Sequence, residues 1–246
     1  MDMLRGEAIG KAGLVEWRKL AQGLHARYVV GDFGAAARFV AAIGATGDEV
    51  GHHPRVVVGS GHVDLELVTA DAIYRDDEGT EYVVEWVTQQ DIDLAGRITE
   101  IAAEQGLTAD PAAVSELELG LDVGSSAAVA PVWAALLTGD AESQGRGTPG
   151  DEVRDATVRV PNLWFDEGDE VAIEDAASDA GAPTGERFHV EVYVAPEARD
   201  SRIAAVVAAG GTVVDDSQAP GLTVIADQEG NRGVLCVDTS AIPTTD

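Results

Sequence analysis

Residues 49–58 have the sequence EVGHHPRVVV, and this stretch decides how the first half of the chain folds. Gly51 suits the end of a helix, because glycine readily takes the left-handed conformation that closes a last helical turn. Pro54 restricts the residue before it to extended backbone, and the β-branched run that follows favours a strand. The stretch is therefore a helix-to-strand junction that carries two adjacent imidazoles. A catalytic pair, half of a metal site and a solvated polar turn are the three interpretations open for them.

Regular hydrophobic patterns lie on both sides of this junction. Before it, after the fair N-cap Asp32, apolar residues follow a helical period: Phe33, Ala36, Ala37, Val40, Ala41 and Ile43. After it, residues 55–69 predict a hairpin whose second arm alternates. The apolar face of that arm consists of Val63, Leu65 and Leu67. The polar face consists of His62, Asp64 and Glu66.

The pattern continues with a second hairpin and a helix. Residues 73–86 predict the hairpin, with a polar turn at 77–79. Residues 88–106 predict an amphipathic helix, for which Thr88 and Asp91 form a capping-box-like start. Strands and helices are therefore mixed throughout the first half.

The second half of the chain restarts the pattern. We interpret residues 109–114 as a linker between an N-terminal domain at residues 1–108 and a C-terminal domain at residues 115–246. The C-terminal part shows a strand, a helix and further strands twice in succession. Such a repeat indicates an internal structural duplication. We expect an α+β protein with two domains.

Composition and charge narrow the class of partner. The chain has 246 residues and a formal net charge of −28. A surface this acidic repels phosphate backbones and anionic lipid headgroups, so we expect neither nucleic acid nor a membrane as a partner. No stretch approaches the roughly 20 apolar residues of a membrane-spanning helix. With no apolar leader at its start and a single cysteine, Cys236, the protein is expected in the cytoplasm.

Roughly residues 14–106 resemble the pterin-4a-carbinolamine dehydratases, also called 4a-hydroxytetrahydrobiopterin dehydratases. The resemblance is carried by Trp17, GDFGAAARFV at 31–40, EVGHHP at 49–54, VDLELVT at 63–69 and TQQDIDLA at 88–95. It implies an antiparallel sheet with helices on one face. It also implies a hydro-lyase that takes a small-molecule pterin as its substrate and requires no cofactor.

The resemblance implies a pterin site around the paired histidines. Dehydrating a 4a-carbinolamine requires a proton donor at the leaving oxygen and a proton acceptor at the neighbouring ring nitrogen. Histidine can serve as either near neutral pH, so His52 and His53 are the expected catalytic acid and base. The expected substrate-binding residues are Glu49, Pro54, Thr69 and Asp91. For Asp91, charge pairing with the N-terminus of its helix is the alternative role.

The chain departs from the family pattern in three places. The family's third active-site histidine corresponds to Ala70, the aromatic residue after the His-His-Pro element corresponds to Val56, and residues 71–86 form an insertion. We expect weakened dehydratase activity, because a positioned general acid or base typically contributes about 10²–10⁴ in rate. A metal on the paired histidines is disfavoured, because adjacent residues rarely chelate one ion well and no His-x-x-x-His spacing supports it.

Residues 115–238 resemble the glyoxalase-like branch of the vicinal oxygen chelate superfamily. The main carriers are LELGLDVGSSAAVAPVWAALLTG at 117–139, RFHVEVYV at 187–194 and VIADQEGNRGVLCV at 224–237. The resemblance implies paired βαβββ modules that form an open cup. It makes His189 and Glu118 weak metal candidates. The usual glutamate of the final strand is absent, so a divalent metal is disfavoured in this domain.

The sequence is compatible with three functions. The first is a 4a-hydroxytetrahydrobiopterin dehydratase with a fused glyoxalase-like domain, weakened by Ala70. The second is a non-catalytic protein that binds a small molecule in the glyoxalase-like cup. The third is a metal-dependent lyase, isomerase or dioxygenase that acts in the C-terminal domain. A homo-oligomer is left open in each case.

Overall fold

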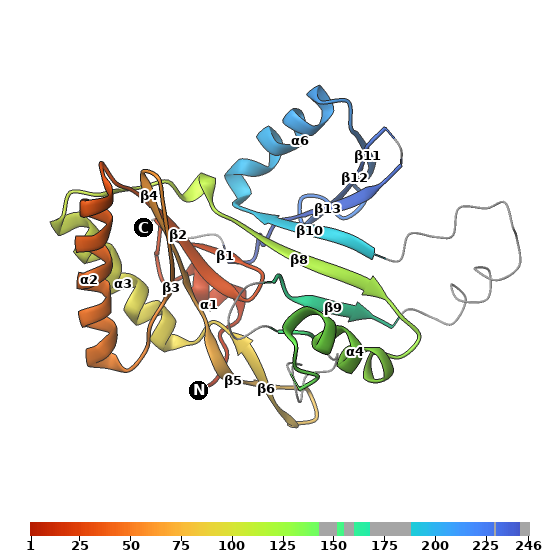
Figure 1. Ribbon diagram of the computed structural model, residues 1–246, viewed down its shortest axis with the longest axis horizontal. Helices are drawn as coiled ribbons and strands as arrows, with labels where there is room; N and C mark the ends of the chain where they lie inside the picture. The colour runs from red at the N-terminus through yellow and green to blue at the C-terminus, as the bar shows by residue number, and fades with distance from the viewer. Residues whose placement is uncertain (143–151, 155–159, 168–187, 229, 242–246) are drawn as a thin grey trace, which may run out of the picture. The chain divides into compact units, whose positions relative to one another are not determined.

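The computed structural model describes residues 1–142, 152–154, 160–167, 188–228 and 230–241 (Figure 1). The chain divides into two compact units. The first unit consists of Met1–Glu116, Tyr193–Arg202 and Val237–Asp246, and the second consists of Leu117–Val192 and Ile203–Cys236. Both units contain helices and strands, which confirms the expected α+β class.

The first unit is built on an antiparallel sheet with strand order β1-β2-β4-β3. Its strands are β1 (Arg18–Leu20), β2 (Gly23–Val29), β3 (Arg55–Gly59) and β4 (His62–Leu67), and the short β7 (Thr108–Ala109) also pairs with β2. In the register of this sheet, Glu66 lies opposite His25 on one side and opposite Arg55 on the other. Three titratable or charged side chains therefore form a row across adjacent strands.

Helices α2 (Phe33–Val50) and α3 (Gln89–Glu104) cover one face of this sheet, as Figure 1 shows. The core between sheet and helices includes Tyr28, Phe39 and Ile98, each fully buried. Alternate residues of β4 are buried against this core, which confirms the expected alternation. The opposite face of β4 carries its polar side chains: His62, Asp64 and Glu66.

The direction expected for the apolar stripe of α2 is wrong. The periodic pattern includes Phe33 in the apolar stripe, but this side chain is 73% exposed. The buried stripe instead runs through Ala36, Phe39, Ile43 and Gly47. Phe33 and Phe39 are six residues apart, which places them roughly 120° apart around a helix of 3.6 residues per turn. A stripe centred on Phe39 therefore turns Phe33 toward solvent.

The two helices begin and end at residues that suit those positions. Asp32 is the N-cap of α2, and its Oδ1 accepts a hydrogen bond from Ala35 N at 2.7 Å. The helix ends at Gly51, which has a φ of 70° in the left-handed region. Helix α3 begins with a capping box formed by Thr88 and Asp91. The helix-to-strand junction at residues 49–58 is thereby confirmed.

A separate two-stranded sheet contains most of the expected insertion. It is formed by β5 (Thr69–Arg75) and β6 (Glu81–Trp86). The carboxylate of Asp76 orders the turn, because it accepts hydrogen bonds from Thr80 N at 2.8 Å and Glu78 N at 3.0 Å. These bonds, chiefly the one from Thr80, lower the pKa of Asp76. The hairpin predicted at residues 73–86 is confirmed, and a short helix α1 (Gly6–Gly10) lies near the start of the chain.

The second sheet has six strands in the order β11-β12-β13-β10-β8-β9. Their bounds are β8 (Ser115–Asp122), β9 (Leu163–Asp166), β10 (Phe188–Val194), β11 (Thr212–Asp215), β12 (Leu222–Ala226) and β13 (Arg232–Cys236). Strand β10, helix α6 (Arg199–Ala208) and β11 to β13 form a complete βαβββ module. Strand β8, helix α4 (Ser126–Thr138) and β9 form the described part of the other module. Residues 143–151 and 155–159, between α4 and β9, lie outside the described residues.

The segment between the two predicted domains has local structure of its own. Within it, β7 pairs with β2, and a 3₁₀ turn η1 (Pro111–Ala113) follows. The first unit also includes residues from later in the chain, among them the 3₁₀ turn η3 (Pro196–Ala198). The domain boundary at residues 109–114 stays a prediction. In the described part of the chain, no helix is both long enough and apolar enough to cross a membrane.

Candidate functional site

The candidate site of the first unit centres on His52 and Asp91. His52 follows Gly51 at the end of α2, and Asp91 lies in the first turn of α3. His52 Nε2 lies 2.6 Å from Asp91 Oδ1. The carboxylate is fully buried, and the imidazole side chain is 12% exposed. A buried carboxylate of this kind fixes the orientation and tautomer of an imidazole, because Nε2–H donates to it.

Asp91 also caps its own helix, and it does so with its other oxygen. Oδ2 accepts hydrogen bonds from Thr88 N at 2.7 Å and from Thr69 Oγ1 at 2.7 Å. One oxygen of Asp91 therefore serves the helix and Thr69, while the other serves His52, and the expected role of Asp91 in substrate binding stays a prediction. The network joins the end of α2, the start of β5 and the start of α3.

The second nitrogen of His52 faces Gln90. Gln90 Nε2 lies 3.5 Å from His52 Nδ1, which is at the outer limit of a hydrogen bond, and it donates to Thr69 Oγ1 at 2.9 Å. With Nε2–H committed to Asp91, Nδ1 carries the lone pair that can accept a proton. The arrangement can therefore perform general acid–base chemistry at one imidazole.

The two adjacent imidazoles point in different directions, in keeping with the extended backbone that Pro54 favours at His53. His53 is half exposed, and its Nε2 lies 2.9 Å from Oδ1 of the exposed Asp48 on α2. His52 instead turns inward to Asp91 on α3. Only the inner imidazole is paired with a fully buried group. The structure thus separates the two candidate catalytic residues into a buried pair and a surface pair.

The other predicted site residues are distributed unevenly. Thr69 is buried and lies in the His52 network, and Pro54 is partly buried at the start of the strand that follows. The carboxylate of Glu49 is exposed and accepts a hydrogen bond from Arg97 Nη2 of α3 at 2.8 Å. Ala70, next to Thr69 on β5, is exposed. The structure brings together His52, Thr69 and Asp91, and it directs His53 and Glu49 to surface partners.

Sequence reasoning missed Gln90 and a second group of titratable side chains. Gln90 has a weak signal, since it precedes Asp91 in the quoted TQQDIDLA element. The second group is His25, Glu66 and Glu116, whose ligand atoms lie within 4.8 Å of one another. The alternating pattern of residues 62–67 had placed Glu66 on a polar face of its strand. No local pattern in the sequence connects Glu66 with His25, about 40 positions before it, or with Glu116, about 50 positions after it.

Burial shifts the proton affinities in this second group. It lowers the pKa of the His25 imidazole to about 3, an effect that the positive charges of Arg55 and Lys19 increase. Burial raises the pKa of Glu66 to about 7, and it outweighs the opposing attraction of Arg55. Both groups are therefore driven toward their neutral forms. Perturbed pairs of this kind gather at binding and catalytic sites, although ordinary ion-pair networks also produce them.

The metal candidates of the second unit lie in different surroundings. Glu118 on β8 is buried. The imidazole of His189 on β10 lies over Gly120 and contacts Trp164, with ring centroids 5.4 Å apart. His189 Nε2 is 3.9 Å from Glu191 Oε1. Among the described residues, the group of three metal-ligating side chains within 4.8 Å of one another includes neither Glu118 nor His189.

Comparisons with known proteins agree with both resemblances inferred from the sequence. Residues 4–101 match the family model described as Pterin 4 alpha carbinolamine dehydratase, and residues 118–236 match the model described as Glyoxalase-like domain. Among solved structures, a transcriptional coactivator/pterin dehydratase from Brucella melitensis is similar at 25% sequence identity and a TM-score of 0.28. That match covers 35% of this chain and 82% of the other chain. No curated protein matches the chain.

Proposed function

We propose that the first unit is a 4a-hydroxytetrahydropterin dehydratase, a hydro-lyase whose main acid–base residue is His52. The observation that carries the proposal is the 2.6 Å contact between His52 Nε2 and the fully buried carboxylate of Asp91. The match of residues 4–101 to the dehydratase family model supplies the reaction class. The proposal gives the fused glyoxalase-like region no part in this step.

The proposed step removes water from a 4a-carbinolamine. The bond between C4a and the hydroxyl oxygen breaks, and the oxygen leaves with an added proton as water. The neighbouring ring nitrogen loses its N–H proton to a base and forms the new C=N bond. His52 suits one of these two transfers, because Asp91 holds its Nε2–H and leaves Nδ1 as the exchanging atom. No cofactor is required, since the step involves no net oxidation or reduction.

The second proton transfer is the weaker part of the proposed machinery. His53 is the partner suggested by the resemblance, but its imidazole is half exposed and paired with Asp48. Ala70 offers no titratable group next to Thr69. We therefore propose slow turnover, with a rate reduced by about 10²–10⁴ relative to a site with both groups in position. Thr69, Gln90 and Asp91 serve to orient His52.

A stopped-flow assay on enzymatically generated 4a-hydroxytetrahydropterin tests the proposal. The variants are His52→Ala, His53→Ala and Ala70→His, with His62→Ala as a histidine control from the other face of the sheet. We expect the largest loss for His52→Ala, a smaller loss for His53→Ala, a gain for Ala70→His and no change for His62→Ala. If none of the first three variants differs from the uncatalysed background and no pterin binds, the first unit is not a dehydratase.

A second candidate function is small-molecule binding by the glyoxalase-like region, and one observation favours it. Trp164 Nε1 is buried and has no hydrogen-bond partner within the described part of the chain. Trp133 of α4 and Phe188 of β10 form an edge-to-face pair with centroids 5.1 Å apart. Aromatic side chains with an unused N–H suit a planar ligand that carries one acceptor. Quenching of tryptophan fluorescence by aromatic acids, lost in Trp164→Phe, would support this candidate.

A further inference from the structure

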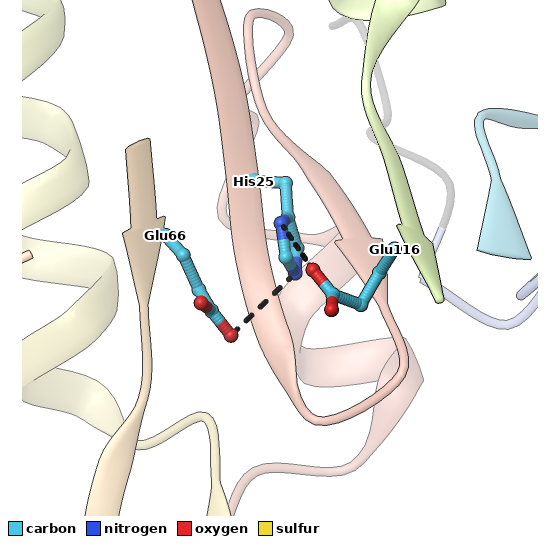
Figure 2. A group of neighbouring side chains, drawn as sticks. All are labelled: His25, Glu66 and Glu116. Carbon is cyan, nitrogen blue, oxygen red and sulfur yellow. Dashed lines mark ion pairs between the residues drawn. The ribbon is translucent and has the colours of Figure 1, made fainter. Parts of the chain in front are cut away.

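The face of the first-unit sheet that carries no helix holds a compact group of ligating side chains. His25 on β2 and Glu66 on β4 are directly opposite each other in the strand register. Glu116, at the start of β8, approaches the same imidazole (Figure 2). His25 Nε2 lies 3.9 Å from Glu66 Oε1, and Nδ1 lies 3.8 Å from Glu116 Oε2. Three segments far apart in the sequence thus converge at one point.

The imidazole of His25 has an unused nitrogen that is buried. Its side chain is 7% exposed, and among the described residues Nε2 has no hydrogen-bond partner. The ring does make a hydrogen bond with the backbone of Leu20, which must therefore involve Nδ1. A buried polar atom without a partner costs roughly 1–3 kcal/mol, so its persistence needs an explanation. Metal-ligating histidines commonly have this arrangement, with one nitrogen on a backbone carbonyl and the other on the ion.

His25 lines a cavity of suitable size and lining. The cavity has a volume of about 190 Å³, and His25, Arg55, Asp64, Glu66 and Glu116 contribute to its wall. A water molecule takes up about 30 Å³ in the liquid, so the space admits an ion together with a few waters. All of these residues belong to the first unit.

The spacing of the three side chains is close to what a metal needs. Bonds of about 2.0–2.2 Å from a tetrahedral ion place ligand atoms roughly 3.4 Å apart. His25 Nε2 lies 3.9 Å from Glu66 Oε1, about half an ångström more than this, and one ligand atom from each of the three side chains lies within 4.8 Å of the others. Rotation of the two flexible glutamate side chains can bring their oxygens within reach of an ion on Nε2. The backbone does not have to move.

A cation already occupies the position between the two carboxylates. Arg55 Nη2 forms an ion pair with Glu66 and lies 3.4 Å from Glu116 Oε2. One nitrogen atom therefore contacts both carboxylates. The Arg55 side chain is 33% exposed, so it can turn toward solvent without leaving a charge buried. An ion with access to the unused His25 nitrogen would compete with it for the same two carboxylates.

We propose that His25, Glu66 and Glu116 form an exchangeable site for a divalent first-row transition metal, with Zn²⁺ as its preferred ion, that displaces Arg55. One imidazole and two carboxylates form a donor set that suits Zn²⁺ better than the all-oxygen sites of Mg²⁺ and Ca²⁺. Three protein ligands leave an open position for water. The bound ion would join β2, β4 and the start of β8, so it would also stabilise the first unit.

The test measures Zn²⁺ binding to the full-length protein after treatment with a chelator. Titration calorimetry gives the affinity, and a Co²⁺ substitute gives an absorption spectrum that reports coordination by nitrogen and oxygen. We expect near-stoichiometric binding, with affinity lowered at least about ten-fold in Glu116→Gln and in His25→Gln. We expect Arg55→Gln to raise the affinity, because the competing cation is gone. The melting temperature should rise with Zn²⁺ concentration.

Two histidine variants serve as controls. His62→Gln changes the same sheet face outside the group, and His189→Gln changes the candidate of the second unit. Neither should alter the affinity. Glu116 is partly exposed, so Glu116→Gln keeps the test valid if His25→Gln fails to fold. The proposal is wrong if neither the natural protein nor Arg55→Gln binds Zn²⁺, which would leave Arg55 as the permanent counter-ion. It is also wrong if binding survives in Glu116→Gln but is lost in His189→Gln.

Discussion

The imidazole of His53 packs so closely against Gly47 that no side chain fits between them. A Cβ atom added at Gly47 would lie 2.6 Å from His53 Cδ2 and 2.8 Å from the carbonyl oxygen of His52. Gly47 also accepts the backbone hydrogen bonds that end α2, from Gly51 N at 2.8 Å and His52 N at 3.2 Å. The absence of a side chain at this position thus sets how the two histidines leave the helix.

Replacing Gly47 by alanine should destabilise the protein. Alanine normally favours a helix interior over glycine by about 1 kcal/mol. At Gly47 that gain is opposed by the contact with the carbonyl oxygen of His52, which cannot move without disturbing the junction. Gly44→Ala, three residues earlier on α2, is the matched control, because its added Cβ meets nothing within 4 Å. Denaturant unfolding should show a loss for Gly47→Ala and a gain of roughly 0.5–1 kcal/mol for Gly44→Ala.

Replacing Asp91 by asparagine should separate catalysis from helix capping. The amide keeps an oxygen that can accept from Thr88 N, but it removes the charge that holds Nε2–H of His52. We expect dehydratase activity to fall by about 10²–10⁴. ¹⁵N-detected imidazole resonances should show the Nε2–H tautomer of His52 in the natural protein and a changed tautomer in the variant. Asp93→Asn, an exposed acidic position on the same helix, should change neither measurement.

The stability of the metal-free protein should depend on pH through His25. Its pKa is lowered from 6.5 to about 3, so the unfolded chain takes up a proton below pH 6.5 while the folded protein does not. The contribution of His25 is therefore complete above pH 6.5 and is lost as the pH falls toward 3. Glu66 acts in the opposite sense, because its pKa is raised from 4.5 to about 7 and its contribution is lost as the pH rises through 7.

The measurement compares unfolding of the natural protein and His25→Gln between pH 7 and pH 4, with a chelator present. The natural protein should lose more stability than the variant over this range, by more than about 1 kcal/mol. The charges that face the imidazole are those of Lys19, Arg55, Asp64, Glu66 and Glu116. Parallel curves for the two proteins would contradict the burial of His25.

Ending the chain at Cys236 should weaken the first unit. Residues Val237 and Ala241 are 7% and 4% exposed, and Ala241 belongs to the core shared by the sheet and its helices. Losing this burial should cost on the order of 2 kcal/mol. Hydrogen exchange of β2 and α3 amides measures the effect on the first unit alone. Glu197→Gln, which removes only the partly exposed ion pair with Arg18, should cost less than about 1 kcal/mol.

The elements that the sequence predicted well are those that local patterns determine. The period of apolar residues located α3, and strict alternation located the polar and apolar faces of β4. Gly51 and Pro54 marked the junction, because glycine and proline restrict the backbone at their own positions. Phe33 was misplaced because several small residues in α2 left the direction of its apolar stripe ambiguous.

The candidate site depends on contacts that no local pattern contains. The sequence named both His52 and Asp91, but only the packing of α3 against the junction decides which imidazole turns inward. Glu49 has an arginine partner on α3, which its position one turn before His52 does not reveal. The group of His25, Glu66 and Glu116 arises from strand register and from the path of the chain after β7. Contacts across 40 or more residues follow from topology.

The discontinuous make-up of the first unit has a consequence for the order in which the protein matures on the ribosome. Its core includes Ala241, and its surface ion pair with Arg18 uses Glu197. Residues 1–116 emerge first, yet these later partners reach them only after the intervening 76 residues, Leu117–Val192, and then Ile203–Cys236 have been synthesised. Residues 1–116 therefore lack part of the core and surface contacts of the first unit until the later segments have been synthesised. We therefore expect the yield of folded protein to depend on synthesis rate and on chaperone access at that stage.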